Sequence, residues 1–403
     1  MPKRVHRPAM TLCFTGAPRK NKDQVVRKKA VVVLLLLALC YILGLVTASY
    51  LIHHGTRLGS AVTRLLHGKV DPLIVRRDFN QTIYYVTDRK EGPRSNGNAT
   101  YLGDYAGQVS YGLIKLQIPE DRVAGTEISE DVIKKVEPLD HDTFVKSLQD
   151  RAAKPLVVWI HGYRPSFDLG ALHCAQLAHD LNIDATILSF DWTSSGSSLG
   201  YTRDLLQIPH STKHLVNLLK TASNDVKPQR IIVAAHSLGC RLVCLALHKL
   251  YSDPNAKNLK LDQVIFLAPN VDREEFDEDF KSELESLVNR VTIYVSSDDN
   301  VLLLAKLLYN VDSIGLAEHF SADTNLDEIQ SFLYYKKQLP DKIDLVDVSF
   351  FSKNDFLRKH RVFLERPVVE DLFWLLHDYP AAKRHLLKYG DNRDPSNYWV
   401  IPP

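Results

Sequence analysis

The sequence predicts an α/β fold with a mostly parallel central sheet and helices on both of its faces. The first observation is a series of short apolar runs, rich in Val and Ile, that alternate with helical segments from Pro155 onward. Such runs are typical of strands covered on both faces, and their alternation with helices is typical of parallel sheets. The second observation is a serine at the turn between one such strand and the next helix. The third is a long uncharged segment near the N-terminus, which predicts a membrane anchor ahead of the fold.

Each expected element follows from the local spacing of apolar residues. Strands are expected where short β-branched runs end at turns. They are LVVWI (156–160), ATILSF (185–190), RIIVAA (230–235), QVIFLA (263–268), RVTIYV (290–295) and KIDLVDVSF (342–350). Helices are expected where apolar residues recur every three or four positions. They are ALHCAQLAHDL (171–181), TKHLVNLLKTA (212–222) and CRLVCLALHKL (240–250). The composition, 45% hydrophobic and 24% charged, is that of a globular protein.

The N-terminal part of the chain is first strongly basic and then strongly apolar. Residues 1–29 hold nine basic side chains and one acidic one, a net charge of +8, whereas the rest of the chain holds 41 basic and 47 acidic ones, a net charge of −6. Residues 30–52 carry no charge and are long enough to span a bilayer as a helix. Because basic flanks stay in the cytoplasm, we expect a single-pass membrane protein with a cytoplasmic N-terminus and the rest of the chain on the extracytoplasmic side. A cleaved signal peptide is the alternative.

These patterns divide the 403 residues into six parts. We expect a basic cytoplasmic tail (1–29), a transmembrane helix (30–52), a linker (53–80), a small β-rich extension (81–152), the α/β domain (153–378) and a C-terminal tail (379–403). The net charge of +2 is the sum of two opposite parts, and it does not indicate a nucleic-acid partner. The spacing of Cys and His residues predicts no metal site, and no motif indicates a cofactor. The oligomeric state is not predicted.

The strongest chemical signal is Ser237, which lies between the strand RIIVAA and the helix that follows it. The sequence Ala235-His236-Ser237-Leu238-Gly239 fits a nucleophile elbow, in which a sharp turn exposes a serine above the sheet. Such a turn has room only for small residues two positions before and two positions after the serine, and Ala and Gly stand there. The turn also places the backbone N–H of Leu238 beside the serine, where it can stabilise an oxyanion. We therefore expect Ser237 to be a nucleophile.

A second oxyanion donor is expected from the loop after an earlier strand. The strand LVVWI is followed by His161-Gly162-Tyr163-Arg164. Loops at the carboxyl ends of neighbouring parallel strands meet at one edge of the sheet, where ligands bind. The backbone N–H of Tyr163, or that of Arg164, is therefore the candidate donor.

A serine nucleophile also needs a histidine base and a carboxylate that orients the histidine. With the chain order serine, acid, histidine, three aspartates are candidates for the acid. Asp298 and Asp299 are adjacent residues after the strand RVTIYV, and Asp272 follows the strand QVIFLA. The expected base is His360, which comes after the last predicted strand. His377 falls within the next helix.

Further motifs make the chain resemble an uncharacterised family of α/β-hydrolases, a domain-of-unknown-function family grouped with esterase- and lipase-like proteins. The resemblance runs from about Ile83 to Leu376. Its motifs include IYYVTDR (83–89), HGYR (161–164), SFDW (189–192), AHSLG (235–239), LAPNVD (267–272), YVSSDD (294–299), HRVF (360–363) and VVEDLFWLL (368–376). The resemblance implies an α/β-hydrolase fold, with Ser237 at the nucleophile position, Asp299 at the acid position and His360 at the base position. It thereby favours Asp299 over Asp298.

Two residues depart from the family pattern. Arg164 stands where the family usually has Asn, and Arg361 follows the histidine where the family tends to have Ser. We expect the backbone donor of the first loop to be retained, and the side chain of Arg361 to face solvent.

Together these features predict a membrane-anchored serine hydrolase of the esterase- and lipase-like type. We expect it to act on an ester or acyl substrate, either a small molecule or a lipid, through an acyl-enzyme on Ser237. Two alternatives stay open. One is a membrane-tethered binding or scaffold protein that retains the hydrolase fold without catalysis. The other is an amidase or peptidase that uses the same residues.

Overall fold

The computed structural model describes residues 79–119, 127–196, 200–317, 342–349, 360–388 and 398–402. The predicted basic tail, the predicted transmembrane helix (30–52) and nearly all of the predicted linker lie outside these residues. The described residues belong to one compact unit. None of the helices found among them combines the length and the apolar character that a bilayer span requires.

All six predicted strands are present, as β4 to β9. The strands are β1 (Asn80–Glu91), β2 (Tyr101–Gln117), β3 (Ile133–Leu139), β4 (Leu156–Ile160), β5 (Thr186–Asp191), β6 (Ile231–His236), β7 (Leu261–Leu267), β8 (Val288–Val295), β9 (Ile343–Asp347), β10 (Leu387–Lys388) and β11 (Tyr398–Val400). The helices are α3 (His141–Gln149), α4 (Phe167–Leu181), α5 (Tyr201–Thr221), α6 (Leu238–Tyr251), α7 (Arg273–Glu275), α8 (Lys281–Leu287), α9 (Asn300–Tyr309) and α11 (Arg366–Leu376). The three predicted helices correspond to α4, α5 and α6, and each begins earlier than predicted.

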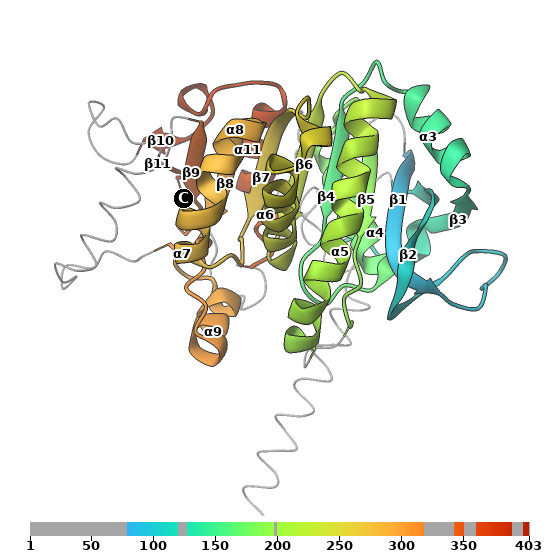
Figure 1. Cartoon of the computed structure of the whole chain (residues 1–403). Coiled ribbons are helices and arrows are strands. Elements are labelled where there is room, and N and C mark those ends of the chain that lie inside the picture. Colours follow the sequence, from blue (N-terminus) through green and yellow to red (C-terminus); the bar gives the residue numbers. More distant parts are fainter. Residues whose placement is uncertain are drawn as a thin grey trace, which may run out of the picture. The chain divides into compact units, whose positions relative to one another are not determined.

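The strands of the described residues form one sheet in the order β10-β11-β9-β8-β7-β6-β4-β5-β1-β2-β3 (Figure 1). The strands from β11 to β1 run parallel to one another. The predicted β-rich extension (81–152) supplies β1, β2 and β3, and the predicted C-terminal tail (379–403) supplies β10 and β11. Both segments are therefore built into the sheet of the α/β domain rather than set apart from it.

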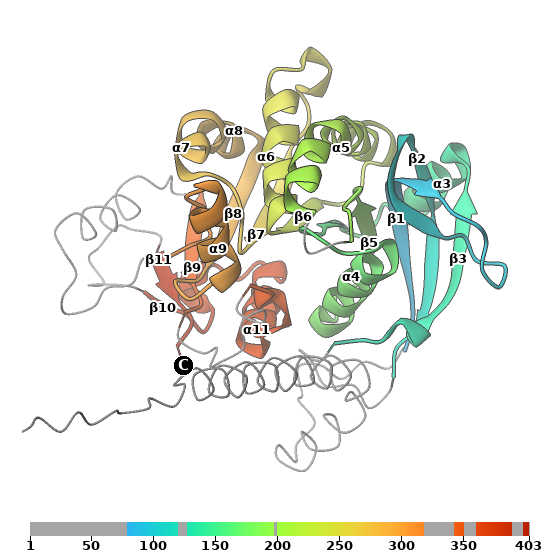
Figure 2. The ribbon, with the colours of Figure 1, turned by 90° about the horizontal axis from the view of Figure 1, so that it is seen from below.

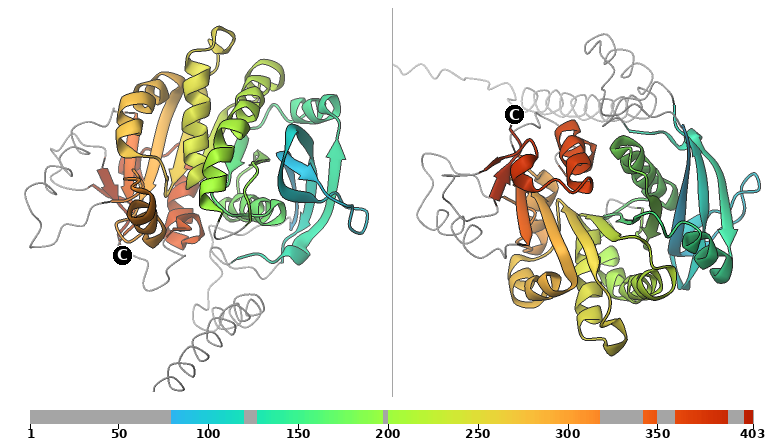
Figure 3. Two further views of the ribbon diagram at one scale, coloured as in Figure 1. Left: turned by 60° about the horizontal axis from the view of Figure 1, so that its bottom comes forward. Right: turned by 90° about the horizontal axis from the view of Figure 1, so that it is seen from above.

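Helices cover both faces of this sheet. In Figure 2, α5, α6, α7 and α8 lie on one face, and α4 and α11 lie on the other; the two views of Figure 3 show the same layers. Each face has its own apolar core, because successive side chains of a strand point to opposite faces. In β4, Val158 and Ile160 enter the core beneath α5 and α6, whereas Val157 and Trp159 enter the core beneath α4 and α11. This explains why the strand sequences are apolar without alternation.

The carboxyl ends of the central strands place the predicted site. β6 lies between β4 and β7, and β8 follows β7. Because these strands are parallel, the loops that begin at His161, Ser237, Ala268 and Ser296 all leave the sheet at the same edge. Segments more than 100 residues apart in the chain therefore meet around Ser237.

Candidate functional site

Ser237 lies in the turn between β6 and α6, in a backbone conformation that few residues other than glycine adopt. Its φ is 54° and its ψ is −121°. A positive φ of this kind costs about 1–3 kcal/mol and persists only where the surroundings enforce it. Here the Ser237 N–H donates to the carbonyl of Leu267 at 3.0 Å, and the Ser237 carbonyl accepts from the N–H groups of Cys240 at 3.0 Å and Asn270 at 3.1 Å. The end of β7 with the loop after it, and the first turn of α6, thus hold the serine above the sheet edge.

The turn is as tight as the sequence pattern requires. A Cβ atom added at Gly239 would lie 2.5 Å from the carbonyl oxygen of His161 and 2.8 Å from that of Ile160. A Cβ atom added at Gly162 would lie 2.8 Å from the Cβ of Ser237. The first of these glycines lets α6 approach β4. The second lets the loop after β4 lie directly against the serine, which brings the two expected oxyanion loops together.

The structure brings Ser237, His360 and Asp299 into one hydrogen-bonded row. The Nε2 atom of His360 lies 2.9 Å from the Oγ of Ser237, and its Nδ1 atom lies 2.8 Å from Oδ2 of Asp299. All three residues are buried, with exposed fractions of 2%, 8% and 0% for Ser237, His360 and Asp299. The other carboxylate oxygen of Asp299, Oδ1, accepts the N–H groups of Val301 at 3.0 Å and Leu302 at 3.1 Å and so caps α9. The helix therefore orients the carboxylate that holds the histidine.

The two rival aspartates occupy other positions. Asp272 caps α7, where its Oδ1 accepts the N–H groups of Glu274 at 3.0 Å and Glu275 at 3.3 Å. Asp298 is the residue before the one that bonds to His360, and its own N–H faces the Oγ of Ser296. His360 thus bonds to Asp299 and not to either rival. His377 ends α11, where its Nδ1 donates to the carbonyl of Phe373.

The expected oxyanion donors differ in what they already contact. Leu238 is the first residue of α6, so its N–H has no acceptor within the helix. The N–H of Arg164 instead donates to the Oγ of Ser194 at 2.7 Å, and that hydroxyl donates to Asp204 at 2.7 Å. Because Arg164 has this buried partner, Tyr163 is the better candidate for the second donor.

The two departures from the family pattern have local structural settings. Arg164 has a φ of 84°, a region that Asn enters more readily than Arg does, so the usual Asn suits this position. The side chain of Arg361 is 30% exposed and forms an ion pair with Glu127. The expectation that Arg361 faces solvent is therefore met only in part, because an acidic partner offsets its charge.

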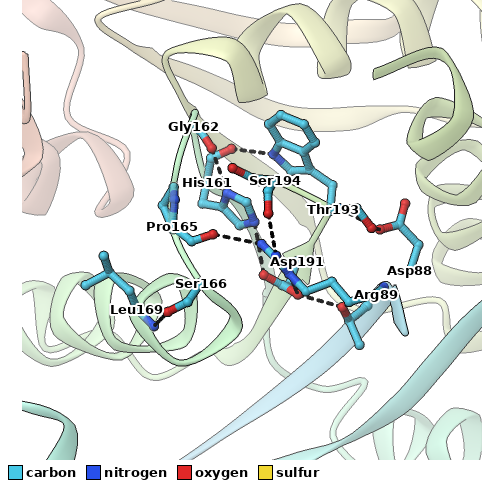
Figure 4. A network of polar contacts seen from close by, with 12 residues as sticks. Asp88, Arg89, His161, Gly162, Pro165, Ser166, Leu169, Asp191, Thr193 and Ser194 are labelled. Carbon is cyan, nitrogen blue, oxygen red and sulfur yellow. Dashed lines mark hydrogen bonds and ion pairs between the residues drawn. The ribbon is translucent and has the colours of Figure 1, made fainter. Parts of the chain in front are cut away.

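A buried polar network, shown in Figure 4, holds the loop after β4 in place. The guanidinium of Arg89, at the end of β1, donates from Nε to Asp191 at 2.8 Å, from Nη1 to the carbonyl of Ser194 at 2.7 Å and from Nη2 to the carbonyl of Pro165 at 2.9 Å. The second oxygen of Asp191 accepts Nε2 of His161 at 3.0 Å. Arg89 therefore ties together the loops that follow β4 and β5.

This network was not foreseen in the sequence, although its residues belong to the motifs IYYVTDR, HGYR and SFDW. Burial alone would raise the pKa of Asp191, but the nearby Arg89 and His161 outweigh it and lower that pKa. The carboxylate is thus charged, and the ion pair is buried at both partners. One feature of the sequence could have drawn attention to these residues, because Arg89 and Asp191 are charged residues at the ends of two apolar strands. No local sequence pattern, however, indicated that they pair across 102 residues.

His236, the residue before the serine, is a second participant that sequence reasoning missed. Its Nε2 donates to the backbone carbonyl of His360 at 2.9 Å, and the two imidazole rings lie 4.8 Å apart. Burial, aided by the positive charge that His360 can carry, lowers the pKa of His236 well below its usual value. The ring is therefore neutral and serves as a fixed donor. It holds the backbone of His360, whose flanking segment on the N-terminal side lies outside the described residues.

The chemistry that this arrangement offers is nucleophilic attack by a serine with histidine as the base. The part of the chain that the structure describes contains no group of three His, Cys, Asp or Glu side chains suited to a metal ion. Burial raises the pKa values of the Cys240 and Cys244 thiols, so these two residues are uncharged packing groups of α6.

Comparison with known proteins gives a family for the chain. The sequence pattern of the family described as "Alpha/beta hydrolase of unknown function (DUF900)" matches residues 138–376, more than half of the chain. The uncharacterised protein alr1448 of Nostoc sp. (strain PCC 7120) is 26% identical over 226 residues, which cover 41% of this chain. The match spans 58% of the length of that relative.

Two solved structures are also similar. A predicted CIB-like hydrolase from Thermoplasma acidophilum shares 12% identity over 72% of this chain and 99% of its own, with a TM-score of 0.32. An esterase from Rhizomucor miehei shares 10% identity over 79% of this chain and 95% of its own, with a TM-score of 0.36. Neither TM-score is high enough to support a conclusion about this chain. The family match and the parallel sheet with its carboxyl-edge serine lead to one conclusion: the chain belongs to the DUF900 family of α/β hydrolases of unknown function.

Proposed function

We propose that this chain is a serine hydrolase that cleaves carboxylic esters through an acyl-enzyme on Ser237. The observation that carries the proposal is the hydrogen-bonded row from the Ser237 hydroxyl through His360 to Asp299. The strained φ of Ser237 adds support, because residues in such conformations cluster at active sites.

The proposed reaction has two halves. The Oγ of Ser237 attacks the carbonyl carbon of the ester while Nε2 of His360 takes the hydroxyl proton, and Asp299 stabilises the imidazolium. The N–H groups of Leu238 and Tyr163 donate hydrogen bonds to the developing oxyanion. His360 then gives its proton to the departing alcohol, and the acyl group stays on Ser237. In the second half His360 deprotonates a water molecule, which attacks the acyl-enzyme and releases the acid.

Esters are the proposed substrate class because an alcohol leaves the tetrahedral intermediate more easily than an amine does. A matched pair of substrates with the same acyl group, one an ester and one an amide, separates this proposal from an amidase or peptidase. We expect turnover of the ester and no detectable turnover of the amide, whereas cleavage of the amide would favour the amidase or peptidase.

Labelling by a fluorophosphonate probe tests the nucleophile directly in the full-length protein. We expect the wild-type protein to be labelled and Ser237→Ala to remain unlabelled. Ser189→Ala is the matched control, because Ser189 is a buried serine on β5 and should not affect labelling. If the wild-type protein were labelled no more strongly than Ser237→Ala, the hydrolase proposal would fail, and the alternative of a non-catalytic binding protein would be favoured.

We also propose that residues 30–52 anchor the protein in a membrane as a single span with a cytoplasmic N-terminus. The support is the uncharged segment and its basic flank. Protease digestion of right-side-out vesicles tests the orientation. The proposal requires cleavage of the domain from outside, and a domain that stays protected would contradict it.

A further inference from the structure

The surface of α9 is unusually apolar for a helix that solvent reaches. The described residues include eleven large hydrophobic side chains that are exposed, and five of them belong to this one helix. Four are leucines: Leu303 is 43% exposed, Leu304 44%, Leu307 81% and Leu308 61%. Residues three and four apart lie on the same side of a helix, so these leucines form one continuous surface. We call these four residues the α9 leucine face.

The pattern of α9 is the reverse of an ordinary surface helix. Leu302 and Ala305 are its buried residues, so one narrow stripe already packs against the domain. A surface helix normally carries polar residues on its remaining sides. Here the sequence NVLLLAKLLY contains no acidic residue, and its one cation, Lys306, pairs with Asp312 at 2.7 Å. A helix that is apolar on nearly every side requires an apolar environment.

The helix that carries the α9 leucine face adjoins the candidate site at both of its ends. Its N-cap is Asp299, whose carboxylate bonds to His360. At its other end the Tyr309 ring stacks on that of Tyr201 at 4.4 Å, and the Tyr201 ring meets Tyr163 edge to face at 5.6 Å. In Figure 1, α9 and the first turns of α5 project together beyond the edge of the sheet. One of those turns of α5 carries Leu206, which is 71% exposed.

The chain outside the described residues indicates what covers this face. Residues 53–78 separate the predicted membrane span from the first described residue. About 26 extended residues reach about 90 Å, whereas a domain of this size has a radius of gyration of about 20 Å. With residues 30–52 anchored in a membrane, as proposed above, the domain is held near a bilayer and can turn any face toward it. A bilayer is then the apolar environment within reach of α9.

We infer that the α9 leucine face inserts into the acyl and headgroup boundary of the lipid bilayer and turns the candidate site toward it. The substrate class then follows: an ester of a lipid that resides in the bilayer, whose acyl chain enters past Tyr309 and Tyr201 toward Ser237. This statement about substrate rests on the proposed hydrolase function, whereas the insertion of α9 rests only on the proposed membrane anchor.

Quenching by brominated lipids tests the insertion without any turnover. The full-length protein carries Ser237→Ala, so that lipid is not consumed, and Cys13 and Cys40 are replaced by Ser. The remaining cysteines, Cys174, Cys240 and Cys244, are buried and do not compete for the label. A bimane fluorophore is attached at Leu307→Cys, and the protein is reconstituted in phosphatidylcholine vesicles with or without bromine on the acyl chains.

The matched control is a bimane at Tyr251→Cys. Tyr251 is 54% exposed and ends α6, which starts at the site and runs to the opposite edge of the sheet. We expect brominated lipid to lower emission from position 307 at least about twofold and to leave position 251 nearly unchanged. Equal quenching at both positions, or none at position 307, would overturn the inference. A cross-link between two copies through position 307 would assign the face to a dimer and would overturn it as well.

Kinetics test the substrate class separately. Leu307→Ser with Leu308→Ser changes only exposed side chains, so the domain should fold normally. We expect about tenfold slower hydrolysis of an ester embedded in vesicles, and an unchanged rate on a short water-soluble ester. Unchanged rates on both substrates would contradict the proposal that the substrate is an ester of a bilayer lipid. If neither substrate is cleaved by the wild-type protein while position 307 is quenched, the hydrolase proposal fails and the insertion of α9 stands.

Discussion

Replacing Asp299 by Asn tests the candidate site most sharply, because the two carboxylate oxygens of this residue have different partners. Oδ1 accepts the N–H groups of Val301 and Leu302 at 3.0 and 3.1 Å, and Oδ2 faces Nδ1 of His360 at 2.8 Å. The amide oxygen of Asn can replace only one of these acceptors. The two helix N–H groups bind the oxygen, so the NH₂ group turns toward His360.

The consequence for His360 can be worked out from this geometry. A donor opposite Nδ1 requires an unprotonated Nδ1, which moves the single ring proton to Nε2. That nitrogen then faces the Oγ of Ser237 with a proton and cannot accept another. For the analogous change in a serine protease the rate falls by about 10⁴. We expect a similar fall in kcat here, equivalent to about 5 kcal/mol of activation free energy.

The assay is hydrolysis of a short water-soluble ester, combined with thermal unfolding. The cap of α9 is kept in Asp299→Asn, so Tm should stay within a few degrees of the wild-type value. Asp298→Asn is the matched control and should keep kcat within about twofold, because His360 bonds to its neighbour. Equal losses in the two variants, or an Asp299→Asn enzyme with more than about a tenth of the wild-type kcat, would refute this reasoning.

Three further predictions concern the surroundings of the site. Arg89→Met leaves Asp191 charged and buried without its partner, so the free energy of unfolding should fall by about 3–5 kcal/mol in a urea titration; a change below about 1 kcal/mol would contradict the role of this ion pair. His236→Phe removes the donor to the carbonyl of His360, so kcat should fall several-fold, whereas His236→Gln should restore part of it if the hydrogen bond is what matters. Burial lowers the pKa of His173 to about 3, whereas the unfolded chain titrates near 6.5. Only the unfolded chain binds this proton between those values, so acidification from pH 7 to pH 5 should cost about 2 kcal/mol of unfolding free energy, and His173→Gln should lack that part of the loss.

Much of the fold could be predicted because its signals are local. Short Val- and Ile-rich runs marked the ends of strands β4 to β9 to within three residues, since burial on both faces requires apolar side chains throughout a strand. The turn at Ser237 was identifiable because its tight geometry tolerates only small residues on either side. His360 was identifiable because it follows the last central strand, where a base can reach the same sheet edge.

The sequence by itself determined the α/β class, the order of the elements and the serine turn, because each depends on neighbouring residues in the chain. The family resemblance favoured Asp299 over Asp298, and the tertiary structure supplies the physical reason: as the N-cap of α9, Asp299 keeps one oxygen on the helix and the other toward His360. Only the tertiary structure decided that the N-terminal strands belong to the main sheet and that Arg89 pairs with Asp191. Such contacts depend on how strands distant in the chain are placed side by side. Packing of the whole domain sets that placement, and no local pattern encodes it.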